Sequence, residues 1–392
     1  MNTTEEEKNI ERFVAENVTE AIWLRLKRLS SEHLCHQVLS KSHPKMQADI
    51  LAIKAQGMSS AVRSALGYWE TQQGGLNSKI LSRYYAILQI TIAEQIASGD
   101  PEENLATAQK HTEHGHGLYT LNSGGASVLG GYYIGCLKSG HFPAYLRSLG
   151  RNIAPHASDR RPRKIEEVDL TKAISLEDLI RRVPEFQANT QEYIGKNPLS
   201  FHVGHATKNH VVRSQRMVEH GNRTGQVIFD PPVDGPTVTT YVAFYPHGSS
   251  VTADQLNGYG FEAKNIVPES GNEALRSEEH FVGEIVHPKG SLWWEYIETY
   301  KSGYCGTSVV VPFWGMKDIF VLHLTILYAF SIIVRYLPET WHEIEHGKLN
   351  HVHALLEHYL VILDNVLPKL AVERLTNTRL VVANPGGLNA PV

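Results

Sequence analysis

The chain has 392 residues, of which 42% are hydrophobic and 20% are charged, a composition typical of a soluble globular protein. Its formal net charge is −4, so no global positive field attracts nucleic acid, and a nucleic-acid contact requires a local basic patch. The three cysteines, Cys35, Cys136 and Cys305, are widely scattered. This spacing excludes a disulfide framework and a thiolate zinc site, and it fits a reducing cytoplasm.

The N-terminal segment, residues 1–60, is rich in Glu, Lys, Leu and Ala and is predicted to be helical. Its first residues are acidic and polar, unlike a signal peptide. A second helix is predicted over residues 78–99, where apolar side chains recur every three or four residues. Its apolar face consists of Leu81, Tyr84, Tyr85, Leu88, Ile92 and Ile96. Asp100 and Pro101 are typical of the cap and first position of a further short helix.

The second segment, residues 61–194, continues with a Gly-rich stretch at 110–133 that is predicted to be a loop passing close to other backbone. Residues 146–164 mix Arg with Pro and Gly, as an exposed connector does. A short helix is then predicted from Ser175, where a capping-box-like start precedes apolar residues.

The middle third of the chain contains β-branched and aromatic stretches, and residues 195–312 are predicted to form a β-containing insertion. Residues 237–245, "TVTTYVAFY", are β-branched and aromatic and are bounded by Pro and Gly, which predicts a strand. "GQVIFD" at 225–230 and "TSVVVPFW" at 307–314 are further strand candidates.

The C-terminal segment, residues 313–392, returns to long helices, predicted over 319–336 and about 343–375. Pro368 is expected to bend or split the second of these. The stretch 319–334 is apolar but shorter than the roughly 20 residues that span a bilayer, and His, Thr and Ser interrupt it. It is therefore predicted to be buried by protein and not embedded in a membrane.

The first and last helical blocks each carry an apolar face too large to leave exposed. We expect these two blocks to pack on each other, with the middle third inserted between them. The predicted fold class is α+β, mainly α, with a helical core formed by N- and C-terminal helices and a β-containing insertion.

Several short motifs resemble known families. "SRYYAILQITIAEQIASG", followed by "HGHGL", resembles the second helix and following loop of HEPN-type helical domains. Together with "SLEDLIRRVPEF" and "VRYLPETW", the same stretch is similar to the bacterial YaaC-like family over about residues 60–345. This resemblance implies a HEPN-like helical core.

HEPN-type domains that cut RNA resemble one another in an Arg followed, after four to six residues, by a His. Arg335 and His342 have six residues between them, so the resemblance implies that they are catalytic in a metal-independent endoribonuclease that dimerises. A histidine suits proton transfer near neutral pH, and a planar guanidinium stabilises charge on a phosphorane. Active members often carry Asn or His directly after the Arg, whereas this chain has Tyr336. The alternative interpretation is that Arg335 only caps a helix end.

Other cationic side chains are candidates for nucleic-acid contacts. The basic run between residues 147 and 164 could neutralise several phosphates, or it could be a solvated linker. A histidine of the "HGHG" loop could face the groove beside the helix of Arg83. The nucleic-acid-binding candidates are Arg83, His114, His116, Arg160, Arg161, Arg163 and Lys164.

His111, His114 and His116 could together bind zinc, but no fourth ligand lies nearby in the sequence, and a flexible loop with backbone-bonded histidines is the preferred interpretation. The chain lacks G-x-x-x-x-G-K-[ST], G-x-G-x-x-G and G-x-S-x-G. We therefore predict no metal site and no cofactor.

Two functions remain open. The first is a cytoplasmic, HEPN-like, RNA-directed protein, an endoribonuclease of a phage-defence or toxin-type module. The second is a non-catalytic helical subunit that dimerises or docks onto a protein partner in a larger complex.

Overall fold

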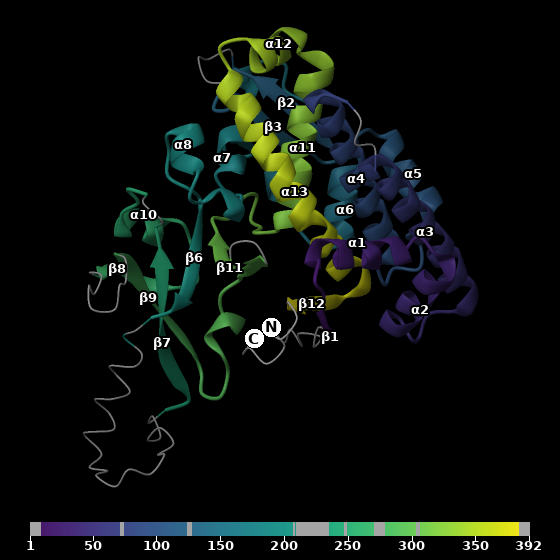
Figure 1. Cartoon of the computed structure of the whole chain (residues 1–392), viewed down its shortest axis with the longest axis horizontal. Coiled ribbons are helices and arrows are strands. Elements are labelled where there is room, and N and C mark those ends of the chain that lie inside the picture. Colours follow the sequence, from purple (N-terminus) through teal and green to yellow (C-terminus); the bar gives the residue numbers. More distant parts are fainter. Residues whose placement is uncertain are drawn as a thin grey trace. The chain divides into compact units, whose positions relative to one another are not determined.

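The computed structural model describes residues 9–70, 74–123, 128–206, 208, 235–246, 249–269, 279–302 and 306–383. The chain divides into two compact units, shown in Figure 1. The helical unit combines Met1–Glu177 with Phe320–Val392, and the sheet unit spans Asp178–Ile319. The sheet unit is longer at both ends than the predicted insertion of 195–312. The predicted fold class, α+β and mainly α, is confirmed.

Helices from both ends of the chain build the helical unit. The N-terminal ones are α1 (Val18–Arg28), α2 (Glu32–Ser42), α3 (Ala48–Glu70), α4 (Leu76–Ala97), α5 (Leu105–Glu113) and α6 (His141–Ser148). The C-terminal ones are α11 (Ile319–Tyr336), α12 (Pro338–His346) and α13 (Asn350–Thr376). Asn104 caps α5 through its side chain, so the helix predicted to begin at Asp100 starts later.

The helix predicted over 343–375 is two helices, α12 and α13. Gly347 ends α12, and Pro368 lies inside α13 without interrupting the helix. Proline removes one backbone donor and disturbs only the turn before it, so a long and well-packed helix can continue through it. Packing is extensive at this point, because Leu367, Pro368 and Ala371 are all buried.

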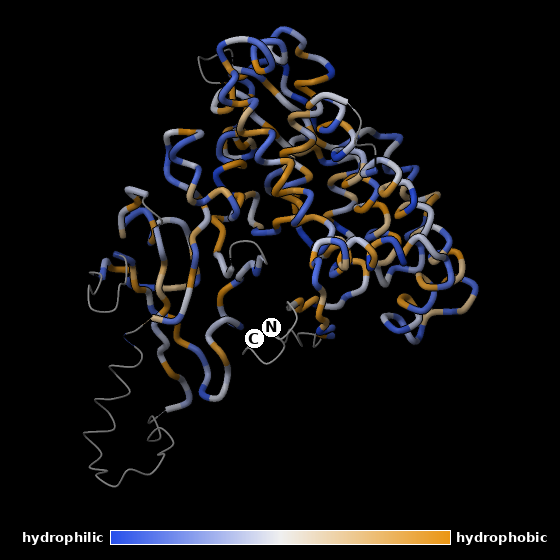
Figure 2. Tube along the Cα trace, in the orientation of Figure 1, coloured by the Kyte–Doolittle hydropathy of each residue, from blue (hydrophilic) through white to orange (hydrophobic). Residues whose placement is uncertain are grey.

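Helix α11 lies at the centre of the helical unit. It is long and apolar enough to cross a membrane, yet 78% of it is buried inside the protein. Figure 2 shows hydrophobic residues gathered in the middle of this unit. The polar side chains of α11 form hydrogen bonds inside the protein: His323 Nδ1 bonds the hydroxyl of Tyr359 at 3.0 Å, and Thr325 and Ser331 donate to carbonyls of the same helix. The helix is therefore a core helix.

Two ion pairs join α4 to α13 and so connect the two ends of the chain. Arg83 forms a bidentate pair with Asp364, at 2.7 and 2.9 Å. Arg374 pairs with Glu94 at 2.8 Å, and Glu94 also accepts a hydrogen bond from Tyr145 on α6. Bidentate guanidinium–carboxylate pairs have a defined geometry, so they hold these helices in register as well as together.

The helical unit also contains strands that the sequence analysis did not predict. β1 (Asn9–Val14), within the segment predicted to be helical, pairs in parallel with β12 (Thr378–Ala383). The stretch predicted to be a loop contains an antiparallel pair, β2 (Leu118–Asn122) and β3 (Tyr132–Leu137). The other edge of β3 pairs with β4 (Ala157–Ser158) and β5 (Ala173–Ser175).

The "HGHG" loop between α5 and β2 lies against the start of α6, as the predicted close approach to backbone requires. The carbonyls of Gly115 and His116 accept hydrogen bonds from the backbone N–H groups of His141 and Phe142. Gly117 has φ +76°, and a Cβ added there would overlap the ring of Pro143. Glycine is therefore required at this position for both its conformation and its size.

We expect Gly117→Ala to lower the free energy of unfolding by about 1–3 kcal/mol more than Gly115→Ala does. Both glycines have positive φ, so both variants carry the backbone strain, but nothing lies within 4 Å of a Cβ at Gly115. Urea unfolding of the two variants measures the difference. Equal stabilities would show that the loop shifts freely and does not hold His116 in place.

The sheet unit contains a six-stranded antiparallel sheet in the order β10-β11-β6-β7-β9-β8. The strands are β6 (Ser200–His205), β7 (Thr237–Tyr245), β8 (Lys264–Glu269), β9 (His280–Pro288), β10 (Tyr300–Ser302) and β11 (Gly306–Val310). Strand β7 confirms the prediction for 237–245, and β11 covers the first part of the predicted 307–314 strand. The candidate strand at 225–230 lies outside the described residues.

Side chains on one face of this sheet form part of the main apolar cluster of the unit. Alternating side chains of β6 and β7, among them Phe201, Val203, Val242 and Phe244, are at most 2% exposed. Helix α10 (Ala253–Gly258) contributes Leu256 to the same cluster, and a capping box starts this helix at Thr252. The short helices α7 (Leu176–Ile180) and α8 (Thr190–Ile194) precede the sheet.

Candidate functional site

A group of aromatic and basic side chains surrounds Arg335, in the last turn of α11. We call it the Arg335 cluster. Its members are Tyr68 of α3, Tyr84 and Tyr85 of α4, His116 of the "HGHG" loop, and Tyr328, Arg335 and Tyr336 of α11.

The Arg335 guanidinium is held by neutral groups. Its Nε donates to the carbonyl of Ser331 at 3.0 Å, Nη1 donates to the hydroxyl of Tyr85 at 3.3 Å, and Nη2 donates to Oγ of Ser331 at 3.2 Å. A guanidinium has five N–H donors, so two have no partner among the described residues and are available to a ligand. The bond to Ser331 places Arg335 at the carbonyl end of α11, where the helix dipole also favours a cation.

Arg335 differs from three other arginines of the helical unit. Arg25, Arg83 and Arg374 each pair with a carboxylate. Within the part of the chain that the structure describes, no carboxylate lies within ion-pair distance of Arg335. Its positive charge is therefore compensated only by hydroxyls, carbonyls and aromatic faces, with its carbon Cζ 5.1 Å from the ring centre of Tyr336.

His116 contacts the buried side of the cluster. Its Nδ1 and the hydroxyl of Tyr84 form a hydrogen bond of 2.8 Å, and its ring lies edge-on to that of Tyr84. The ring of Tyr328 packs against both of them, and its hydroxyl donates to the carbonyl of Leu118. These contacts connect α4, α11 and the start of β2.

The surroundings lower the pKa of His116 below its ordinary value, because burial and then the nearby charge of Arg335 disfavour the imidazolium. His116 is therefore a neutral imidazole at pH 7. Burial also raises the pKa of the Tyr84 hydroxyl strongly and that of Tyr328 to about 12, so both phenols stay protonated.

The outer side of the cluster consists of exposed aromatic rings. Tyr336 is 64% exposed and Tyr68 is 41% exposed. Tyr68 stacks on Tyr85, with ring centres 5.3 Å apart, and Tyr85 in turn holds Arg335. The cluster therefore extends from a neutral, half-buried histidine, through a guanidinium, to rings that are open to solvent.

Arg161, from the predicted basic run, also acts on the cluster. It is exposed, donates to the carbonyl of Thr120, and contributes with Arg335 to the electrostatic environment of Tyr328. Arg160, Arg163 and Lys164 are exposed in the same connector. Arg161 thus links this basic run to the Arg335 cluster.

His342, the second half of the Arg-x6-His pattern, is exposed on α12, the helix after Arg335. Its ring lies edge-on to that of His346, with centres 5.4 Å apart. Only Leu337 separates α11 from α12, so the two predicted residues belong to successive helices at one corner (Figure 1). The side-chain contacts of Arg335 are with Ser331 and the tyrosines, and not with His342.

The remaining candidates lie elsewhere. Arg83 is 4% exposed, and its guanidinium is occupied by Asp364, the carbonyl of Trp69 and the ring of Trp69. His114 is exposed at the end of α5, and His111 faces Glu103 at 3.9 Å. Among the described residues, no group of three or more His, Cys, Asp or Glu side chains has a metal-binding arrangement.

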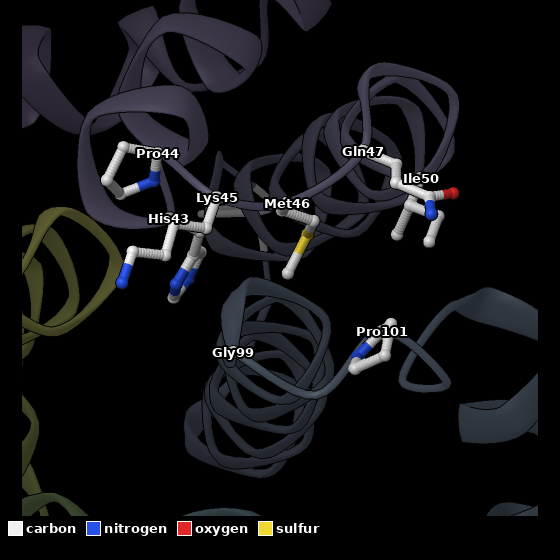
Figure 3. Close-up of a pocket in the computed structure, with 8 residues that line it drawn as sticks. All are labelled: His43, Pro44, Lys45, Met46, Gln47, Ile50, Gly99 and Pro101. Atoms are coloured by element: carbon white, nitrogen blue, oxygen red, sulfur yellow. The ribbon is translucent and has the colours of Figure 1, made fainter.

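A separate hollow of about 550 Å³ lies between the α2–α3 and α4–α5 connections (Figure 3). It is lined by His43, Pro44, Lys45, Met46, Gln47, Ile50, Gly99 and Pro101. His43 donates through Nε2 to the carbonyl of Ala97, which makes it a helix-end cap. The lining is largely apolar and has no group of acid–base residues, so we place the candidate site at the Arg335 cluster.

The sequence analysis did not identify Tyr68, Tyr85, Tyr328 or Tyr336 as site residues. One signal was available in the pair Tyr84–Tyr85. Consecutive positions on a helix face about 100° apart, so a helix with two adjacent tyrosines presents at least one away from the centre of its apolar face. Tyr85 is the one that reaches Arg335.

The fold and site define a mainly helical α+β protein with an arginine among tyrosines at the corner of two helices, and no carboxylate of the described residues pairs with this arginine. The chain belongs to the YaaC-like family, since the model of that family, described as YaaC-like protein, matches residues 27–375. No curated protein and no solved structure matches the chain.

Proposed function

We propose that this YaaC-like protein is directed at RNA and binds a backbone phosphate at the Arg335 cluster. In this proposal it is a HEPN-like, metal-independent endoribonuclease of the cytoplasm, of the kind used in phage-defence or toxin modules, and it acts as a homodimer. The observation that carries the proposal is the Arg335 guanidinium, which keeps two N–H donors and has no carboxylate partner in the described part of the chain.

An arginine of this kind suits a phosphate ligand better than it suits a purely structural role. Arg83 and Arg374, which join helices, are each paired with a carboxylate. The buried Arg182 of the sheet unit donates to three backbone carbonyls, whereas Arg335 keeps two N–H donors without a partner among the described residues. Guanidinium groups bind phosphate through two parallel N–H bonds, and such charge-assisted bonds are about twice as strong as neutral ones. Arg161 supplies a second cation in the charged surroundings of Tyr328.

The chemistry needs one cation and at least one proton carrier. The 2′-oxygen attacks phosphorus, the bond from phosphorus to the 5′-oxygen breaks, and the products are a 2′,3′-cyclic phosphate and a 5′-hydroxyl. A base takes the proton of the 2′-hydroxyl, and an acid gives a proton to the departing 5′-oxygen. We assign the charge stabilisation to Arg335 and proton transfer to the exposed His342.

We expect Arg335→Ala to weaken RNA binding and to reduce the slope of log affinity against log salt concentration by about 0.7, the value for one phosphate contact to a single strand. Fluorescence anisotropy over a salt series measures both quantities. Arg28→Ala is the control, because Arg28 is also a cation in the last turn of a helix but is exposed and lies outside the Arg335 cluster. Equal effects of the two substitutions would leave Arg335 as a helix cap only.

A second function is favoured by one observation. Tyr336 occupies the place after the arginine and is 64% exposed, which suits a surface that contacts another protein. In this alternative the chain is a non-catalytic subunit that dimerises or docks in a complex. Wild-type protein that neither binds nor cuts RNA, but whose self-association is lost in Tyr336→Ala, would support this function instead.

A further inference from the structure

The outer face of the Arg335 cluster carries two exposed tyrosines in one row of contacts. Tyr68 stacks on Tyr85 at 5.3 Å, Tyr85 accepts a hydrogen bond from Arg335, and the guanidinium lies 5.1 Å from the ring of Tyr336. A single exposed tyrosine would be ordinary on a protein surface. Here an exposed ring lies at each end of the row, and a cation without a carboxylate partner lies between them.

We infer that this row is a binding site for unpaired nucleobases, with bases stacking on Tyr336 and Tyr68 while Arg335 holds a phosphate of the same strand. This inference rests on the proposed function and names its substrate class as single-stranded RNA. Sites for single strands combine a positively charged path for the backbone with aromatic side chains on which bases stack.

The structure of a duplex and two features of the row favour a single strand as the ligand. Bases in a duplex are stacked on one another and cannot reach a side-chain ring without being displaced, whereas bases of a single strand can turn outward. The exposed fraction is 64% for Tyr336 and 41% for Tyr68, so each ring keeps surface that a base can cover. The guanidinium itself is a planar group that stacks as well as hydrogen-bonds.

The exposed basic run that includes Arg161 offers further cations to a bound strand. Arg161 is exposed, and with Arg335 it forms part of the charged surroundings of Tyr328. Arg160, Arg163 and Lys164 follow it on the same exposed connector. A strand held at Arg335 therefore has further cations available for its neighbouring phosphates.

The test is fluorescence anisotropy at low salt with a labelled 2′-O-methyl RNA strand, whose blocked 2′-oxygen cannot attack phosphorus. The same strand is measured alone, annealed to its complement, and as the corresponding DNA. We expect the single strand to bind at least about tenfold more tightly than the duplex. Tyr336→Ala and Tyr68→Ala should each weaken single-strand binding by about fivefold or more, the usual effect of losing one stacked base.

Two controls separate stacking from folding. Tyr336→Phe keeps the ring and loses the hydroxyl, so it should retain the affinity of the wild type. Trp294→Ala removes an aromatic ring that is 43% exposed and lies 5.9 Å from the amine of Lys301, outside the Arg335 cluster, and should leave RNA affinity unchanged. Thermal melting of each variant verifies that the fold is intact.

The outcomes distinguish this inference from the proposed function. Binding that depends on Arg335 but is unchanged in both tyrosine variants, or that is equally tight for the duplex, overturns the stacking site and leaves RNA binding in place. Equal affinity for the DNA strand supports stacking and overturns the choice of RNA. Absence of binding to every strand overturns the proposed function and the inference together.

Discussion

Replacing His342 by alanine is expected to lower the rate of RNA cleavage by about 10²- to 10⁴-fold, the usual effect of removing a general acid or base. His342 is exposed on α12, so its ring can be lost without opening the core. The far-ultraviolet circular dichroism and melting temperature of the variant should therefore match those of the wild type. Cleavage by the wild type should persist in EDTA, because the proposed chemistry uses only His and Arg.

His346→Ala is the matched control for this experiment. His346 is one turn further along α12, its side chain is 67% exposed, and its ring touches that of His342. Its loss removes the same kind of surface group, so cleavage should stay close to that of the wild type. The products of the wild-type reaction, separated by chromatography, should end in a 2′,3′-cyclic phosphate.

Two results would contradict the assignment to His342. If His342→Ala cuts RNA at the wild-type rate while His116→Gln does not, proton transfer belongs to His116, the neutral imidazole bonded to Tyr84. If neither the wild type nor any variant cuts RNA with its natural partners present, the non-catalytic function remains.

The helices were predictable from the sequence because their signals are local. Helix α4 shows its apolar period directly, and α11 is recognisable as a buried helix by its length and its few polar residues. The strand β7 is β-branched, aromatic and bounded by Pro and Gly, so its residues indicate a strand without reference to its neighbours.

The strands of the helical unit depend on partners that no local signal reveals. β1 pairs with β12, where Asn9 is matched with Thr378 at the opposite end of the chain. Most of its side chains are exposed, so there is no apolar alternation to indicate a strand. Strands β2 and β3 lie in a Gly-rich stretch, where glycine allows a close approach of backbones as readily as it allows a loop.

The site was predictable only in part, because one of its signals is local in sequence and the others are not. The Arg-x6-His pattern is local, so it identified Arg335 and paired it with His342. The groups from outside α11 that contact Arg335 come from α4, 250 residues earlier in the case of Tyr85. Sequence spacing could not show that Arg83 is occupied by Asp364 while its neighbour Tyr84 faces His116. That outcome depends on which face of α4 meets α13 and which meets α11.

Lowering the pH below 6.5 is expected to destabilise the protein steeply, because two buried histidines must remain neutral in the folded state. His141 is 1% exposed and His323 is fully buried, and burial lowers their pKa values to about 4 and about 3. His141 bonds Thr91 through Nε2 and His323 bonds Tyr359 through Nδ1. In each ring the other nitrogen has no partner among the described residues, so no group there stabilises an added proton.

The direction in which the free energy of unfolding changes with pH follows from proton binding. Between about pH 4 and 6.5 the unfolded chain binds a proton at each of these two histidines and the folded chain does not. The free energy of unfolding therefore rises with pH in this window and falls on acidification, by about 1.4 kcal/mol per pH unit for each histidine. Burial raises the pKa of Glu185, so that carboxyl acts in the opposite direction.

Urea unfolding at several pH values between 7 and 5 measures this slope. A glutamine does not titrate, so we expect His323→Gln to remove about half of the slope of unfolding free energy against pH that the two histidines contribute. His346→Gln, at an exposed position, should leave the slope unchanged. The substitution at His323 lowers stability at pH 7 through altered packing, so the comparison is between slopes and not between absolute stabilities. If His323→Gln and the wild type lose stability in parallel as the pH falls, the histidine in the middle of α11 takes up its proton without leaving the core, and the acid sensitivity comes from other groups.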